Sequence, residues 1–212
     1  MRYEQLKNDY SRLLETLNFN SLKKNKDVIR SCTKRICNNM QRYQNVSDML
    51  AYENYIMPPP LIGIIHLLES SLNFKTHLHN GDPLTARTVH VPKGRPPEGE
   101  PPFTWEASAV DALKLKLNDL RKEGDYLDFG ELEQWLYFLE RYNGMGYRKR
   151  GINSPYLWSG TNLYTRGKYV ADGRFDPYAV SKQVGAVPII IEMIEQGVIE
   201  TNIEGLKNEK KD

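Results

Sequence analysis

The sequence has few cysteines and lacks long apolar runs. It holds only two cysteines, Cys32 and Cys37, and a spacing of five residues fits neither a CxxC redox pair nor a zinc knuckle. On one helix the two thiols would lie more than a turn apart, so we expect both to be free. The longest apolar runs, residues 61–65 and 187–191, are too short to span a bilayer, so we expect no transmembrane segment.

Motifs for phosphate and metal chemistry are also missing. The sequence contains no Gly-x-x-x-x-Gly-Lys-Ser/Thr phosphate loop and no HExxH or HxxxH pair. His77 and His79 lie close to Asp82, which is a weak zinc signal, and we favour hydrogen bonding by these histidines instead. We therefore predict no metal and no cofactor.

Charge is distributed unevenly along the 212 residues. Residues 1–45 hold ten Lys or Arg against four acidic residues, a net charge of +6, which leaves −4 for the remainder. This basic segment suits attraction to an anionic polymer such as a cell wall, a membrane surface or nucleic acid, or it is simply a solvated helical face. The length and the 40% apolar content fit one domain with a helical appendage.

Hydrophobic spacing predicts a mainly α fold with one small β excursion between two helices. The β-like stretch is 85–91, and the proline-rich segment 92–102 after it cannot be helical. Thr104 and Asp128 are the predicted N-caps of two helices, and 143–178 reads as long ordered loops. Helices are expected over 3–17, 22–43, 46–52, 60–72, 105–120, 129–142 and 183–196, the last ending at Gly197.

Glu69 is the first candidate functional residue, because it sits near the end of a short and almost wholly apolar helix. Burial costs an ionised carboxylate more than a neutral one, so a Glu in such a place tends to keep its proton. A protonated Glu at the edge of a cleft is what glycoside cleavage needs as a general acid. The alternative is a Glu whose carboxylate reaches water at the end of the helix.

Asp82 is the second candidate, thirteen residues further along in a Gly-Asp-Pro turn. It could act as the second carboxylate, as a base toward water or by stabilising an oxocarbenium-like transition state. The alternative is an Asp that caps its own turn.

The segment after residue 140 is rich in aromatic, Asn and Gly residues. Aromatic rings mixed with polar groups suit sugar binding, because the rings stack on apolar sugar faces while the polar groups bind hydroxyls. They also suit core packing or single-stranded nucleic acid, although Glu140, Asp172 and Asp176 oppose the latter. The predicted substrate-binding residues are Ser70, His79, Tyr142, Asn143, Gly144, Tyr147, Tyr156, Trp158 and Tyr164.

Two motifs in order resemble those of the lysozyme-like superfamily, in its lytic transglycosylase and goose-type lysozyme branch. Glu69-Ser70 resembles the Glu-Ser pair of that branch, and Tyr142-Asn143-Gly144 resembles its Tyr-Asn motif. The run from His66 to Trp105 is similar to lysozyme-family proteins of bacteria and phages, and the likeness covers roughly 46–195. The sequence departs from the pattern by a Gly after Asn143 and by a long loop at 147–178.

The resemblance implies a lysozyme-like α+β catalytic domain over 46–200, preceded by a basic helical extension over 1–45 and followed by a charged, disordered tail over 201–212. It implies cleavage of the β-1,4 bond between N-acetylmuramic acid and N-acetylglucosamine in peptidoglycan, with Glu69 as the acid. Asp82 would activate water; without it, the muramoyl 6-hydroxyl would attack. Ser70 would orient Glu69, and Tyr142 and Asn143 would hold an N-acetyl group.

Further expectations concern partners and location. We expect a monomer that binds peptidoglycan or a related β-1,4-linked amino-sugar glycan and no nucleic acid. The polar first residues contain no signal peptide, so we expect synthesis in the cytosol and action on the wall after release or delivery. The alternatives are a chitin or chitosan hydrolase, a non-catalytic wall-binding or phage structural module, and nucleic-acid binding through the basic helices.

Overall fold

The computed structural model describes residues 1–171 and 173–200, and these are mainly helical with one small sheet. The mainly α class with a small β excursion is thus confirmed. The chain divides into two compact units. We call Lys34–Phe129 the central unit, and Tyr3–Thr33 together with the described residues between Gly130 and residue 200 the terminal unit.

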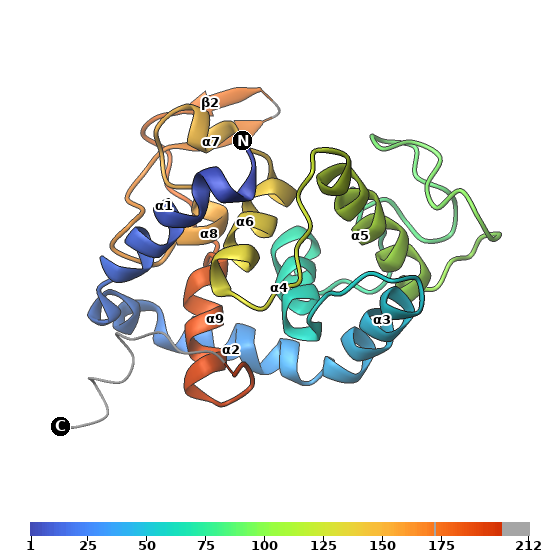
Figure 1. Ribbon diagram of the computed structural model, residues 1–212, viewed down its shortest axis with the longest axis horizontal. Coiled ribbons are helices and arrows are strands. Elements are labelled where there is room, and N and C mark those ends of the chain that lie inside the picture. Colours follow the sequence, from blue (N-terminus) through green and yellow to red (C-terminus); the bar gives the residue numbers. More distant parts are fainter. Residues whose placement is uncertain (172, 201–212) are drawn as a thin grey trace. The chain divides into compact units, whose positions relative to one another are not determined.

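The central unit is built around an apolar helix, α4. Residues 61–68 of α4 are all buried, and α4 packs on α3, which in turn packs on α5 (Figure 1). Thr104 caps α5 as predicted, since its side chain accepts a hydrogen bond from the backbone N–H of Ala107 at 3.2 Å. The helices are α3 (Met40–Tyr52), α4 (Pro59–Ser70) and α5 (Trp105–Lys122), preceded by the end of α2 (Lys26–Cys37).

The connection from α4 to α5 is a long ordered loop (green in Figure 1), and the predicted strand at 85–91 is wrong. Within 71–104 the backbone forms only an isolated bridge between Thr76 and Pro83. The N–H groups of Val89 and His90, which a strand would offer to a neighbour, donate instead to the Asp82 carboxylate. The Asp82 side chain thus accepts the hydrogen bonds that the carbonyl groups of a neighbouring strand would otherwise accept.

The terminal unit combines the first helix with the last third of the chain. α1 packs on α6, α6 on α8, and α8 on α9. β1 and β2 form an antiparallel hairpin that pairs Lys168 with Asp176, so the β excursion lies here. The elements are α1 (Tyr3–Glu15), η1 (Phe19–Asn25), most of α2, α6 (Leu132–Asn143), α7 (Gly146–Lys149), α8 (Pro155–Trp158), β1 (Lys168–Ala171), β2 (Arg174–Asp176) and α9 (Ala186–Glu195).

The largest differences between the observed and the predicted helix boundaries concern α2, α3 and the start of α6. The expected helix 22–43 is broken at Asn38 and Asn39, and its last part joins the expected helix 46–52 in α3. The expected cap Asp128 lies three residues before the N-cap position of α6, which Glu131 occupies. Thr33 and Lys34 mark the unit boundary, inside α2, whereas the extension was expected to end at residue 45.

A catalytic domain over 46–200 stays a prediction, and the tail 201–212 lies outside the described residues. No helix in the described part of the chain is long and apolar enough to cross a membrane.

Candidate functional site

Glu69 lies in the last turn of α4, and it is exposed although the eight residues before it are buried. Burial of its carboxylate, which the apolar helix led us to expect, is therefore not observed. The reason is that α4 ends one residue later, at Ser70, so its last turn emerges from the core. The Ser70 hydroxyl donates to the carbonyl of His66 at 3.2 Å, a bond that caps the helix backbone.

The turn after Glu69 and Ser70 has unusual backbone geometry. Ser71 and Leu72 both adopt positive φ, at 53° and 64°, although neither is glycine. Such a conformation costs roughly 1–2 kcal/mol per residue. Arg35 stabilises it by donating from Nη2 to the carbonyl of Ser71 at 2.8 Å. These two strained residues lie two and three positions after the candidate acid, and backbone strain of this kind clusters at functional sites.

A cluster of aromatic rings lies behind this turn. The ring of His66 packs against Phe74 and Trp105, with centroids 4.5 and 4.3 Å away, and its Nδ1 lies 3.1 Å from the hydroxyl of Tyr43. Burial lowers the pKa of His66 to about 4, so the ring is neutral near pH 7. The guanidinium of Arg42 covers Phe74 at 3.8 Å from the ring centroid. The helix end that carries Glu69 therefore rests on a packed base.

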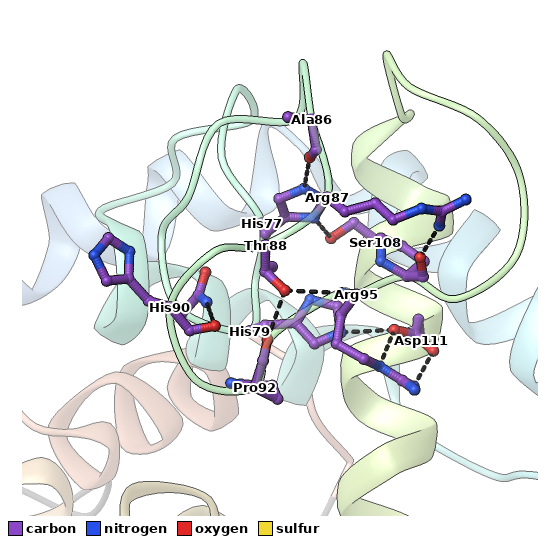
Figure 2. Close-up of polar contacts among 12 residues, drawn as sticks. His77, His79, Ala86, Arg87, Thr88, His90, Pro92, Arg95, Ser108 and Asp111 are labelled. Carbon is purple, nitrogen blue, oxygen red and sulfur yellow. Dashed lines mark hydrogen bonds and ion pairs between the residues drawn. The ribbon is translucent and has the colours of Figure 1, made fainter.

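The loop that follows is held by two histidines (Figure 2). His77 is buried, with Nδ1 2.7 Å from the hydroxyl of Ser108 and Nε2 2.8 Å from the carbonyl of Ala86. Both ring nitrogens have partners inside the protein. His77 thus fastens the loop to α5 by hydrogen bonds, which agrees with the role we favoured for the histidines.

His79 was predicted to bind substrate, but its side chain is only 1% exposed and bonds to Asp111 of α5. Its Nε2 lies 2.8 Å from Oδ2 of Asp111, and Arg95 also donates to both oxygens of that carboxylate (Figure 2). Burial acts to raise the pKa of Asp111, but the His79 hydrogen bond and the Arg95 charge outweigh it and lower the pKa. His79 therefore belongs to the support of the loop and has little surface for a sugar.

Asp82 is likewise engaged by its own loop. Its Oδ2 accepts the N–H groups of Val89 and His90 at 2.8 and 3.0 Å, and Oδ1 lies 2.6 Å from Nδ1 of His90. The backbone N–H of His90, followed by its ring, lowers the pKa of Asp82 to about 2. This is the capping arrangement that we set out as the alternative to a catalytic carboxylate.

The Tyr-Asn motif lies at the end of α6 in the terminal unit. Asn143 is exposed and its amide donates to the hydroxyl of buried Ser154 at 3.5 Å. Tyr142 is half-buried, 6.1 Å from the ring of Phe138. Gly144 ends the helix with φ 97°, a conformation that favours glycine. The motif thus presents one polar side chain and a sharp turn to solvent.

Three of the predicted sugar-stacking residues are core residues instead. Tyr147, Trp158 and Tyr164 are 8%, 1% and 8% exposed. The Tyr147 hydroxyl accepts the N–H of Tyr169 at 3.0 Å, and that of Tyr164 donates to the carbonyl of Gly167. These rings, together with Pro155 and Leu157 of α8, form part of the packed interior of the terminal unit. Tyr156 is half-buried and stays a candidate.

Two ion pairs were not predicted from the sequence: Arg95 with Asp111, which is partly buried, and Arg148 with Glu140, whose carboxylate is buried. A usable signal was present in each case. Asp111 interrupts an apolar stretch of α5, and Glu140 directly follows the buried run 135–139 of α6. An acidic residue on a buried face normally needs a cation or several donors.

Within residues 1–171 and 173–200, no three His, Cys, Asp or Glu side chains gather closely enough to hold a metal ion. Comparison with known proteins finds no matching family model, no matching curated protein and no matching solved structure. The lysozyme-like resemblance thus rests on the residue motifs alone.

Proposed function

We propose that the protein is a muramidase that cleaves the β-1,4 bond between N-acetylmuramic acid and N-acetylglucosamine in peptidoglycan. Glu69 is the general acid of this proposal. Tyr142, Asn143 and Gly144 contribute sugar binding, because they match the Tyr-Asn motif of the family that the chain resembles.

The observation that carries the proposal is the local structure around Glu69. Glu69 is exposed in the last turn of a helix whose residues 61–68 are buried, and the strained pair Ser71–Leu72 follows Ser70. A fixed backbone and an accessible carboxylate are what a residue that meets a polymeric substrate requires. The packed base of His66, Phe74 and Trp105 limits movement of this end.

An exposed carboxylate needs a further step before it can act as an acid. In the proposal a bound glycan covers Glu69 and displaces water, which favours the protonated form. Glu69 then donates its proton to the glycosidic oxygen as the bond to C1 breaks. Activity is therefore expected to fall as pH rises and Glu69 in the complex ionises.

Substitution of Glu69 by Gln tests the proposal. The Gln variant keeps size and hydrogen bonding but has no proton to give, so we expect the same fold and a rate lowered by roughly a hundredfold or more. Release of soluble fragments from purified bacterial walls gives the rate, and circular dichroism checks the fold. Glu98→Gln, at an exposed position of the loop, is the matched control. Equal rates in wild type and Glu69→Gln would rule out the acid role.

The exposure of Glu69 favours one second candidate, a wall-binding module without catalysis. In that case the wild-type protein would sediment with bacterial walls and release no sugar from any wall preparation. Glu69→Gln would then leave both results unchanged. The same two assays therefore separate the candidates.

A further inference from the structure

The turn that carries the Tyr-Asn motif is bounded by a backbone hydrogen bond at Gly144 and by a close approach of Tyr169 at Gly146. The N–H of Gly144 donates to the carbonyl of Glu140 at 2.9 Å, which closes the end of α6. On the other side, a Cβ on Gly146 would come within 3.0 Å of the hydroxyl of Tyr169. Gly146 thus leaves little space for a side chain, whereas Gly144 has open space around it, and the turn is held by the residues that flank it.

Glu140 and Arg148 flank the turn and bind each other. Glu140 is only 2% exposed, and Arg148 donates to its Oε2 from Nε and Nη2 at 2.9 and 2.8 Å. A buried carboxylate without partners would be strongly destabilising, so this fork is a firm link. The pair joins the last turn of α6 to α7. The Tyr-Asn motif lies between Glu140 and Arg148 in the sequence.

The N-terminal helix completes the link. The hydroxyl of Tyr10, on α1, donates to Glu140 Oε2 at 2.5 Å, and Nη1 of Arg148 pairs with Asp9 at 3.2 Å. Burial, followed by the charge of Glu140, raises the pKa of Tyr10, so its phenol stays a hydrogen-bond donor. The Arg148 guanidinium also covers the Tyr10 ring, 4.9 Å from its centroid. Three elements thus converge on one buried carboxylate.

We propose that Arg148 and Glu140, supported by Tyr10 and Asp9 of α1, are positioning residues that hold Asn143 and Gly144 in place for glycan binding. This inference rests on the proposed function. It gives α1 a part in the site, whereas the sequence reading placed residues 1–45 outside the catalytic domain. The four side chains act through the backbone of the turn.

Arg148→Lys is the test, because lysine keeps the charge and loses the fork. We expect a folded protein in which kcat/KM on wall fragments falls roughly tenfold, mainly through KM. The backbone amide of Gly144 should exchange with deuterium faster. Without Arg148 bound to its side chain, Glu140 is less fixed, and the hydrogen bond from Gly144 to its carbonyl opens more often. Arg30→Lys is the matched control, because Arg30 pairs with another buried carboxylate of the same unit, Glu192, at 3.4 Å.

Two readouts keep this test separate from that of the proposed function. The proposal is overturned if Gly144 exchange is unchanged in Arg148→Lys, or if both lysine variants lose kcat/KM in proportion to their loss of thermal stability. Absence of cleavage by the wild type would instead count against the muramidase. Binding of an N-acetylglucosamine tetramer, followed by the NMR signal of the Asn143 side-chain amide, would then decide whether the Glu140–Arg148 pair serves glycan binding.

Discussion

Asp82 illustrates how the position of one carboxylate decides its chemistry. The sequence offers Asp82 as a partner for Glu69, because a glycosidase commonly uses two carboxylates. In the structure both oxygens accept hydrogen bonds from the loop at 89–90, while the His90 side chain itself is 77% exposed. A carboxylate so engaged is poorly available as a base. We therefore assign Asp82 to the loop rather than to the reaction.

Replacement of Asp82 by Asn should lower the free energy of unfolding, with a defined pH dependence. The folded pKa of about 2 lies below the roughly 3.9 of an unfolded Asp, so its contribution is complete above about pH 4 and is lost as pH falls through about 2. The variant should therefore be less stable than the wild type at pH 7. The difference in unfolding free energy between the two proteins should become smaller as pH falls from about 4 to 2. Urea unfolding of both proteins across this pH range measures the difference. A difference that does not change with pH would contradict the role of the ionised Asp82 in the loop.

The residues that sequence alone identified are those whose signal is local. The end of an apolar helix predicted where Glu69 lies along α4, yet not that its carboxylate is exposed, because that depends on how α4 emerges from the core. The aromatic segment predicted rings without telling core from surface. Trp158 in α8 and Tyr164 in the loop after it are both core residues, because a short helix and a loop pack here through their aromatic rings.

At the scale of elements, apolar periodicity predicted most helices, since it records which face is buried. The long 71–104 loop was misread in part as a strand, because β-branched residues there resemble one. Its order comes from contacts between residues that are distant in sequence. Arg95 with Asp111 and His77 with Ser108 are separated by 16 and 31 positions, so no local pattern shows which residues pair, although Asp111 in an apolar stretch signals that it needs a partner.

Gly63 allows α4 to pack closely against its neighbouring helices, so its substitution should affect stability. It lies in α4, where Ala would normally favour the helix by about 1 kcal/mol. A Cβ here would collide with Cγ2 of Ile36 and come within 2.9 Å of Tyr43. We expect Gly63→Ala to destabilise the protein by about 1–3 kcal/mol despite its helix propensity.

Chemical unfolding of Gly63→Ala, Ile36→Ala and the double variant tests this packing argument. Removal of the Ile36 side chain opens space for the new methyl group, so the double variant should be more stable than the sum of the single effects allows. Additive losses would show that the helices do not approach closely at Gly63.

The whole molecule combines a central unit from one continuous segment with a terminal unit from both ends of the chain. Sequence predicted the mainly α class, because that needs only the periods of the helices. It did not predict that the first helix packs with the last third of the chain, since such pairing leaves no local mark. The candidate acid Glu69 belongs to the central unit and the Tyr-Asn motif to the terminal unit.

The course of the proposed cleavage depends on how many carboxylates take part in it. With Asp82 engaged by its loop, the proposed reaction relies on Glu69 as its acid and base. In this proposal Glu69 would protonate the glycosidic oxygen, the bond to C1 would break, and the 6-hydroxyl oxygen of the same muramoyl residue would bond to C1. That hydroxyl would return its proton to the Glu69 carboxylate, so that no water is consumed and Glu69 is regenerated.

Mass spectrometry of digested peptidoglycan distinguishes this course from hydrolysis. We expect muropeptides that are one water lighter than their hydrolysed counterparts and that carry no reducing end. Digestion in water enriched in ¹⁸O should leave them unlabelled, because no solvent oxygen enters the new bond. Asp82→Asn, assayed where it remains folded, should give the same products. Labelled reducing ends would mean that water attacks, and their loss in Asp82→Asn would return Asp82 to the reaction as the base.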